Sequence, residues 1–142
     1  MAKIVVGVDG SDPSRHALRW AVEEARLRGA EVVALHAYQV VVVPTDVTPV
    51  VTLELPSLVT DLRAAAEKIV EDAVREARRD GDVKITGQIV EDTAAEALIE
   101  AARDAELLVV GSRGLGELKA LLLGSVSHRV VQQATCPVVV HR

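Results

Sequence analysis

The segment IVVGVDGS, residues 4–11, indicates the fold class at the start of the chain. Its first five residues form a short apolar run that is typical of a strand buried on both faces of a sheet. Residues 9–11, DGS, are turn formers, and Pro13 suits the first turn of the helix that follows. Apolar residues recur at helical spacing up to Gly29, after which residues 31–38 are expected to form a second strand.

The same alternation of strands and helices continues to the end of the chain. A long helix is expected from Ser57 to Asp80, with one apolar stripe that would face the sheet. The stripe consists of Leu58, Leu62, Ala65, Ile69 and Ala73. The remaining elements are expected as strands at residues 83–90, 107–110 and 138–140 and helices at 94–103 and 125–134. This order predicts an α/β fold in a single domain, residues 1–142: a doubly wound, Rossmann-like sheet of five mainly parallel strands with about four helices.

The segment from Val40 to Pro56 does not fit this alternation. It contains three prolines and is long for a connection without secondary structure inside a compact domain. Two interpretations stay open: a lid or interface segment, or an irregular extended stretch of valines packed on the body of the protein.

The composition limits the partners and the compartment. The chain carries 16 Lys and Arg against 21 Asp and Glu, a net charge of −5, and has no dense basic run, so nucleic acid and membrane surfaces are not expected partners. The single cysteine, Cys136, lies in an apolar run and is expected to be buried. No stretch is long and apolar enough for a signal peptide or a membrane span, which predicts a cytoplasmic protein.

Two loops are expected to carry the ligand chemistry. In a doubly wound sheet, ligands bind beyond the carboxyl ends of the strands where the strand order reverses, and the loops after the first and fourth strands would meet there. The second loop contains Gly111, Gly114 and Gly124, with hydroxyls from Ser125 and Ser127 in the helix that follows. Glycines let main-chain amides approach a phosphate, and amides at a helix start favour negative charge. Each glycine taken alone also fits an ordinary turn or helix cap.

Asp9 lies at the end of the first strand and has two roles open to it besides that of a turn residue. Its carboxylate can accept a hydrogen bond from a ribose hydroxyl, or help to hold a divalent cation, Mg²⁺ or Mn²⁺, beside phosphates. The histidines His16, His36 and His141 have no metal-ligand spacing and are expected to be structural. His128 is expected to face outward from its helix.

Three other classes of protein that bind or carry phosphate groups do not fit the sequence. The Gly-Lys-Ser or Gly-Lys-Thr of a P-loop occurs nowhere in the chain. Gly114-Leu115-Gly116 could begin a dinucleotide fingerprint, but Lys119 occupies the third glycine position and too little chain follows for a second half. A phosphorylatable receiver domain would need further acidic residues beside Asp9.

Four stretches together resemble the universal stress proteins, in the branch that binds ATP. They are IVVGVDGS at residues 4–11, AEALIEAA at 95–102, LLVVGSRGLG at 107–116 and LLLGSVSHRVVQQATCPVVVHR at 121–142. That branch carries a glycine, two residues, a glycine, nine residues and then Gly-Ser or Gly-Thr, and the spacing is matched here. The resemblance covers nearly the whole chain.

The resemblance implies an adenine nucleotide α hydrolase-like sheet with ATP bound across the ends of the first and fourth strands, and a homodimer formed through the last strand. By position, the residues that would hold the ribose and phosphates, largely through main-chain amides, are Gly111, Gly114, Gly124, Ser125 and Val126. Asp9 would face the nucleotide, and Val8 and Ala37 would border the adenine.

One departure from the family pattern lies after the third strand, where Asp92-Thr93-Ala94 replaces the small glycine and proline-type turn of many relatives. Asp92 could repel a phosphate or cap the following helix, and the cap is favoured. We expect ATP to act as a bound signal with slow or no hydrolysis, since Glu117 and His128 are the nearby candidates for a base and both suit a surface position. The alternative is a nucleotide-free dimeric scaffold that binds a protein partner.

Overall fold

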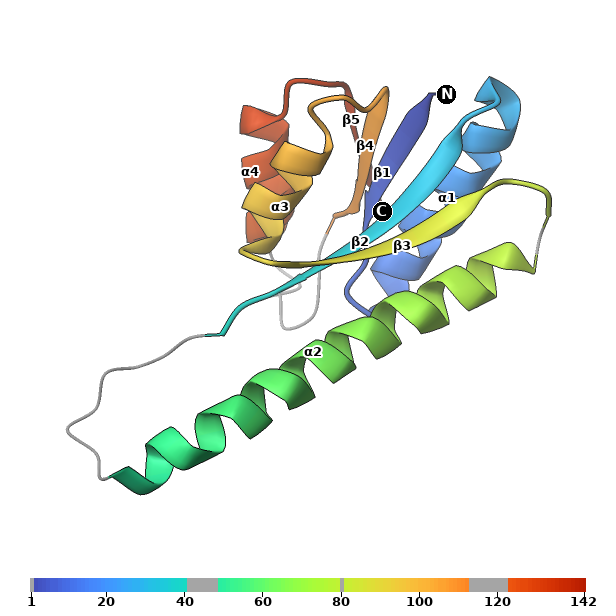
Figure 1. Ribbon diagram of the computed structural model, residues 1–142. Helices are drawn as coiled ribbons and strands as arrows, with labels where there is room; N and C mark the ends of the chain where they lie inside the picture. Colours follow the sequence, from blue (N-terminus) through green and yellow to red (C-terminus); the bar gives the residue numbers. More distant parts are fainter. Residues whose placement is uncertain (1, 41–48, 80, 113–122) are drawn as a thin grey trace.

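The computed structural model describes residues 2–40, 49–79, 81–112 and 123–142, and these residues form five strands and four helices. In chain order they are β1 (Lys3–Gly7), α1 (Asp12–Arg28), β2 (Glu31–Tyr38), α2 (Pro49–Arg78), β3 (Ile85–Glu91), α3 (Ala94–Ala101), β4 (Leu107–Gly111), α4 (Ser125–Gln133) and β5 (Val138–His141). All the strand pairs are parallel, and the strand order is β3-β2-β1-β4-β5 (Figure 1). The predicted fold class is confirmed.

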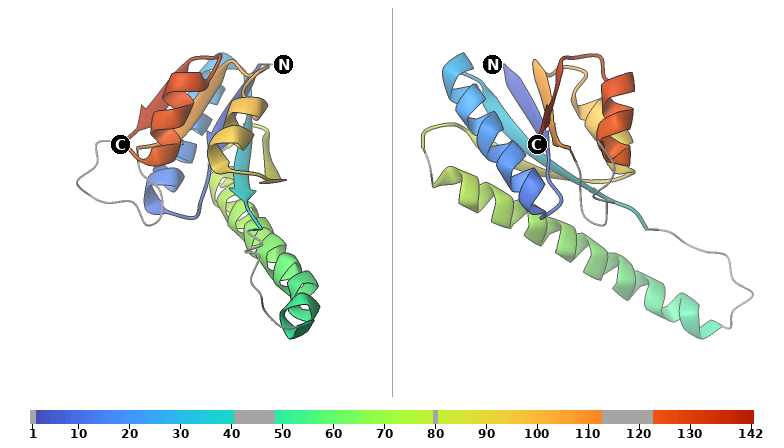
Figure 2. Two further views of the ribbon diagram at one scale, coloured as in Figure 1. Left: turned by 90° about the vertical axis from the view of Figure 1, so that its left-hand side faces the viewer. Right: turned by 180° about the vertical axis from the view of Figure 1, so that it is seen from behind.

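Helices cover both faces of the sheet. α1 and α2 pack on one face, and α3 and α4 pack on the other (Figure 1, Figure 2). The apolar residues of β1 alternate between the two layers, because Ile4 and Val6 belong to the cluster with α1 and α2, and Val5 to the cluster with α3 and α4. All three side chains are fully buried. A strand that is apolar on both faces thus lies at the centre of the sheet.

The boundaries of α1 follow its sequence signals. Ser11 is the N-cap, and its Oγ accepts a hydrogen bond from Ser14 N at 3.3 Å. Gly29 ends the helix in the left-handed conformation, with a φ of 66°, which favours glycine. Gly10, with a φ of 83°, turns the chain out of β1 in a conformation that would strain other residues.

The connection predicted from Val40 to Pro56 is wrong over residues 49–56, because α2 begins at Pro49 and continues through Pro56 to Arg78. Residues 41–48 lie outside the described residues. Pro49 suits a first helical position, whereas a proline inside a helix removes one main-chain hydrogen bond. The helix was predicted to begin only after Pro56, at Ser57, but the 30-residue helix accommodates this proline.

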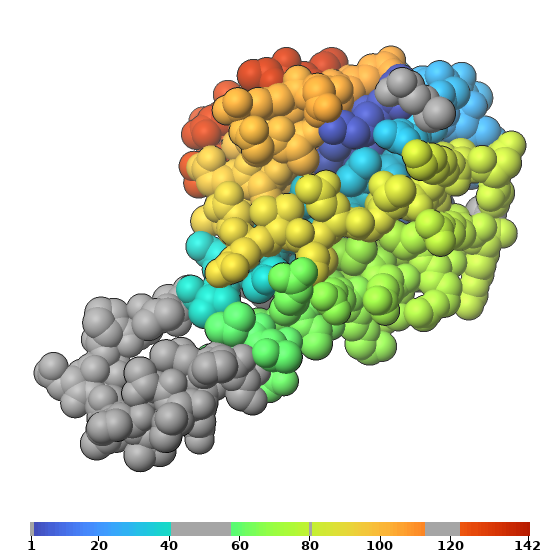
Figure 3. Space-filling model, in the orientation of Figure 1, coloured from blue at the N-terminus to red at the C-terminus, as the bar shows by residue number. Residues whose placement is uncertain are grey.

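The face of α2 that contacts the sheet also differs from the predicted stripe. Leu58 is 50% exposed and Ala65 is exposed, although Ala73 is buried as expected. The buried side chains of α2 are Ala66, Val70, Ala73 and Val74. A Cβ at Gly87 of β3 would lie 2.2 Å from Val70 Cγ1, so this glycine lets α2 approach the edge strand closely at Val70. Figure 3 shows α2, in green, lying along β3, in yellow.

Candidate functional site

β1 and β4 are neighbours at the centre of the sheet, and the chain leads from β1 into α1 on one face and from β4 to α4 on the other (Figure 1). The strand order reverses between them, which is where open α/β sheets bind ligands. A cleft of about 270 Å³ lies at this point. Its walls come from the ends of β1, β2 and β4 and from the starts of α1, α3 and α4.

Six of the eight residues predicted for the site line this cleft: Val8, Asp9, Ala37, Gly111, Gly124 and Val126. Ser125 is the first residue of α4, is exposed, and does not belong to the lining residues. Gly114 lies outside the described residues. Ser14 and His36 also line the cleft, although neither was predicted for the site. A signal for His36 is present, since a polar residue near the end of a central strand lies on the ligand-binding edge.

The loop after β1 is held by its own side chains. Asp9 Oδ1 accepts hydrogen bonds from Ser11 N at 2.9 Å and from Ser11 Oγ. Asp9 N donates to Ser14 Oγ at 3.3 Å, and Ser14 Oγ donates to Ser11 O at 3.0 Å. The carboxylate of Asp9 therefore acts as a turn residue, as one interpretation of the sequence holds, and at the same time lies beside the cleft.

The start of α4 is fixed to the end of β4 by hydrogen bonds. Gly124 N donates to Ser112 O at 2.6 Å, and Ser127 Oγ donates to Gly111 O at 2.5 Å, from a residue that is 3% exposed. Gly124 is the N-cap and makes no side-chain hydrogen bond to the helix, and the first turn contains no acidic residue. The first-turn amides of α4 therefore border the cleft without a capping side chain or a carboxylate from their own helix.

The end of β2 forms a third wall of the cleft. Main-chain groups of alternate β2 residues point toward β1, and Val8 N donates to Leu35 O at 2.9 Å. Ala37 lies two residues further and directs its N–H and C=O to the same side. The register of β1 with β2 ends at Gly7 and Leu35, and no main-chain hydrogen bond within the described ranges joins Val8 to Ala37. A main-chain donor and acceptor thus border the cleft.

The turn before α3 explains Asp92. Thr93 caps α3, and its Oγ1 accepts a hydrogen bond from Glu96 N at 3.2 Å. Asp92 Oδ1 accepts from Thr93 N at 2.7 Å, and Asp92 is exposed. Thr93 rather than Asp92 is therefore the helix cap, and the Asp92 carboxylate stabilises the turn in front of it. Asp92 does not appear among the described residues that line the cleft.

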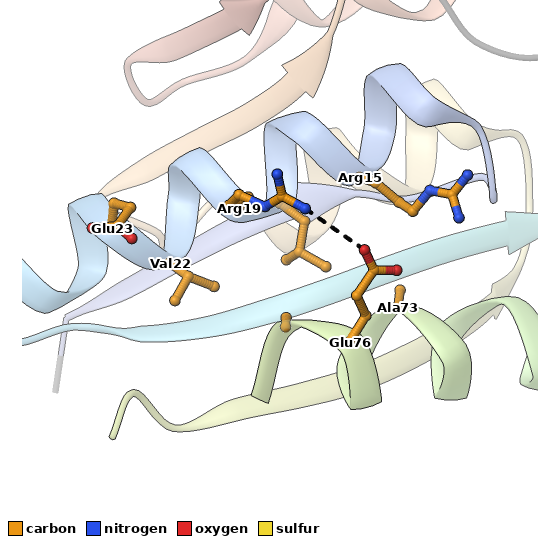
Figure 4. A pocket seen from close by; sticks show the side chains of 8 residues that line it. Arg15, Arg19, Val22, Glu23, Ala73 and Glu76 are labelled. Carbon is orange, nitrogen blue, oxygen red and sulfur yellow. Dashed lines mark ion pairs between the residues drawn. The ribbon is translucent and has the colours of Figure 1, made fainter. Parts of the chain in front are cut away.

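Two other hollows lie beside α2. The hollow between α1 and α2 has a volume of about 30 Å³, room for a few water molecules at most, and Arg19 Nη2 lies 3.8 Å from Glu76 Oε1 there (Figure 4). The other, of about 670 Å³, is a groove between α2 and β3 that includes Gly87 and Ile89. Neither lies at the carboxyl ends of β1 and β4, so the switch-point cleft is the candidate site.

The other reactive groups in the described part of the chain do not add chemistry to this cleft. Cys136 is only partly buried, not fully buried as expected, and this partial burial raises the pKa of its thiol, which disfavours the reactive thiolate. His128 is exposed on α4. The described ranges contain no group of three or more His, Cys, Asp and Glu residues placed to hold a metal ion. None of the described helices is long and apolar enough to cross a membrane.

The fold and the cleft define a doubly wound α/β protein with a candidate ligand site at its strand switch point. The model of the universal stress protein family matches residues 1–142, and the chain belongs to that family. Universal stress protein YxiE of Bacillus subtilis is 37% identical over 145 residues, covering 99% of this chain and 98% of YxiE. A universal stress protein of Mycolicibacterium smegmatis is 36% identical over 140 residues, covering 96% of this chain. The chain spans 47% of that relative and about half the length of several other mycobacterial relatives.

Solved structures share the fold. Universal stress protein UspA from Lactobacillus plantarum has a TM-score of 0.85 and 24% identity, covering 99% of this chain and 97% of its own. The universal stress protein from Archaeoglobus fulgidus in complex with dAMP has a TM-score of 0.75 and 25% identity, covering 100% and 98%. A universal stress protein in complex with cAMP has a TM-score of 0.68 and 28% identity, covering 98% and 94%.

Proposed function

We propose that this chain binds an adenine nucleotide, ATP in the cell, in the switch-point cleft, and that the bound nucleotide acts as a signal in a stress response. The observation that carries the proposal is the start of α4, where first-turn amides border the cleft without a capping side chain or an acidic residue in the first turn. Family membership and the dAMP-bound and cAMP-bound structural neighbours support an adenine ligand.

Phosphate oxygens are the ligand groups that the start of α4 favours. Val126 and Ser127 occupy the second and third helical positions, where amides have no acceptor within the helix, and the helix dipole adds positive potential. Gly111 and Gly124 allow the main chain to approach a phosphate closely. Gly114 and Ser125 belong to the proposal through their spacing in the sequence.

The base is proposed to lie at the end of β2. Ala37 presents an N–H donor and a C=O acceptor on one side of the strand, and adenine offers the complementary pair, the N1 acceptor and the N6 amino donor. Val8, 4% exposed, and Leu98, 3% exposed, give the cleft apolar walls beside this edge. The combination suits a flat, partly apolar ring with a polar edge.

Asp9 is proposed to contact the ribose or a cation. Its carboxylate lies beside the cleft, where it can accept a hydrogen bond from a ribose hydroxyl or help to hold Mg²⁺ or Mn²⁺. Since no cluster of three or more ligand side chains occurs within the described parts of the chain, such a cation would take most of its ligands from phosphates and water.

Hydrolysis is proposed to be slow. Rapid phosphoryl transfer needs a positioned water and charge stabilisation together, and main-chain amides bind phosphate without orienting a water. His128 is exposed, and Glu117 lies outside the described residues. Turnover with Mg²⁺ should therefore stay below the ~1 per second that marks the lower end of ordinary enzymes.

Mass spectrometry of small molecules released from the denatured, purified protein tests the proposal without a prior choice of ligand. We expect ATP or another adenine nucleotide, and saturable binding of ATP and AMP by calorimetry. A second candidate function, the nucleotide-free interaction scaffold, predicts neither. The absence of both retained nucleotide and measurable binding would reject the nucleotide site in favour of the scaffold.

We also propose that two copies of this single domain associate through β5 in the cytoplasm. β5 is an edge strand, so one side of its main chain has no partner strand in its own sheet, and a two-fold partner could pair with it. Deleting Pro137–Arg142 should give a monomer or an unfolded chain in sedimentation experiments. A parent protein that is monomeric at high concentration would refute the dimer.

A further inference from the structure

His36, in β2, contacts the main chain directly after the neighbouring strand β1, beside the cleft. Its ring nitrogen Nδ1 lies 2.7 Å from Val8 O. A carbonyl oxygen accepts hydrogen bonds and cannot donate them, so Nδ1 carries the hydrogen. The neutral imidazole is therefore held in the Nδ1–H tautomer by this contact.

The same carbonyl is the natural acceptor for another donor. Val8 N donates to Leu35 O at 2.9 Å, and a regular parallel ladder would continue with Ala37 N donating to Val8 O. That bond is missing from the main-chain hydrogen bonds of the described residues, although β2 continues to Tyr38 and pairs there with β3. The His36 side chain occupies the acceptor in its place.

We infer that His36 is a positioning residue for the base: its Nδ1–H occupies Val8 O, ends the ladder between β1 and β2 one bond early, and leaves Ala37 N–H available to an acceptor on a bound adenine. The inference rests on the proposed nucleotide site. A packing role would require only the volume of the ring. The positioning role instead requires His36 Nδ1 and Ala37 N to compete for Val8 O, so that the bond from His36 keeps Ala37 N away from this oxygen even though a carbonyl oxygen can accept two hydrogen bonds.

The ligand-free protein gives the first test. His36→Phe keeps an aromatic ring and removes the donor, so Ala37 N should bond to Val8 O and its amide hydrogen exchange, followed by NMR, should slow at least about tenfold. His36→Asn, which can donate from a similar position, should restore exchange close to that of the parent. His16→Phe, at an exposed position of α1, is the matched control and should leave Ala37 unchanged. The ¹⁵N shifts of the parent ring should report the Nδ1–H tautomer.

Ligand binding gives the second test. The affinity of His36→Phe for AMP should fall about fivefold, the effect of one net hydrogen bond, and His36→Asn should recover most of it. Tripolyphosphate, which has phosphates and no base, should bind the parent and both variants equally.

The outcomes separate the inference from the proposed function. A folded His36→Phe protein with unchanged exchange at Ala37 would overturn the competition, and slowed exchange with unchanged AMP affinity would overturn the role toward the base. A parent that fails to bind AMP would reject the proposed function itself, while the exchange of Ala37 in His36→Phe would still decide whether His36 competes for Val8 O.

Discussion

The starts of α1 and α4 border the same cleft and are constructed in opposite ways. α1 is capped by Ser11, carries Asp12 in its first turn, and has Asp9 hydrogen-bonded in front of it. α4 has Gly124 as its N-cap, which offers no capping side chain, and its first turn contains no acidic residue. The amides at the start of α1 therefore find an acceptor and negative charge within the protein, whereas those of α4 are suited to an acceptor from outside, and an anion fits that need.

The start of α3, at the same edge of the sheet, resembles that of α1 and not that of α4. Its first turn is capped by Thr93 and contains Glu96. An N-cap side chain usually stabilises a helix by about 1 kcal/mol. α4 thus forgoes a stabilisation that α1 and α3 both have, as is common where a site keeps polar groups available for a ligand.

The largest effect should come from giving α4 a cap like that of α1. Gly124 has a φ of −70° and a ψ of 167°, which other residues adopt without strain. In Gly124→Asp the carboxylate would accept from the first-turn amides and place a negative charge where phosphate is proposed to bind. We expect the affinity for ATP, measured by calorimetry, to fall about a hundredfold or more, because like charges about 4 Å apart repel strongly near a protein surface.

Gly124→Asn is the matched control for the charge. It has nearly the same shape and also caps helices, so it should weaken ATP binding less than Gly124→Asp does. Equal affinities of Gly124→Asp and the parent would show that the phosphates do not bind at α4.

A smaller effect is expected when a hydrogen bond that holds the start of α4 against the end of β4 is removed and no cap is added. Ser127→Ala deletes the hydroxyl that donates to Gly111 O and leaves that carbonyl without this donor. The free energy of unfolding in urea should fall by about 1–3 kcal/mol. ATP affinity should fall as well, by about tenfold, because the start of α4 would lose one of the two hydrogen bonds that join it to the β4 end among the described residues. Unchanged ATP affinity in a destabilised variant would show that this bond serves folding alone.

The fold was predictable because its signals are local. The apolar run at residues 4–8, the Ser11 cap and the Gly29 terminus each act through neighbouring residues, and they define β1 and α1 well. The contact face of α2 was not predictable in this way. It depends on Val70 meeting Gly87 of β3, and the helix has an alternative apolar stripe of similar length, so only tertiary packing selects the buried face.

The residues of the candidate site also differ in whether the sequence alone could predict their roles. Val8, Ala37 and Gly111 could be placed at the cleft because strand ends gather at one edge of a parallel sheet. His36 could not be assigned its contact, since no sequence pattern tells which carbonyl a ring nitrogen on a neighbouring strand will reach. The open start of α4 lies between these cases: its glycine spacing suggests a phosphate loop, but the absence of a cap from the described residues around it is a structural observation.

Removing the cap of α3 should cost stability without changing the ligand site. Thr93→Ala deletes the hydroxyl that accepts from Glu96 N, and the free energy of unfolding should fall by about 1 kcal/mol. ATP affinity should stay within about threefold of the parent, since Thr93 does not line the described part of the cleft. Thermal or urea unfolding and calorimetry on one preparation measure both. A loss of affinity as large as that of Ser127→Ala would mean that the start of α3 also binds the ligand.

The smallest effect is expected from removing the ion pair between α3 and α4. Arg129 of α4 pairs with Glu96 of α3, and the two side chains are 43% and 45% exposed. Water and salt screen such a pair, and ordering two long side chains costs entropy, so its coupling energy should stay below about 1 kcal/mol. A double-mutant cycle of Arg129→Gln and Glu96→Gln measures that coupling, with Arg103→Gln, from the exposed pair with Glu100, as the matched control.

ATP affinity should change less than about twofold in Arg129→Gln, because hydrogen bonds to β4 already fix the start of α4. A fivefold loss of affinity in Arg129→Gln, absent in Arg103→Gln, would show instead that the spacing of α3 and α4 controls the cleft, and that the main-chain contacts with β4 are insufficient to hold its phosphate side.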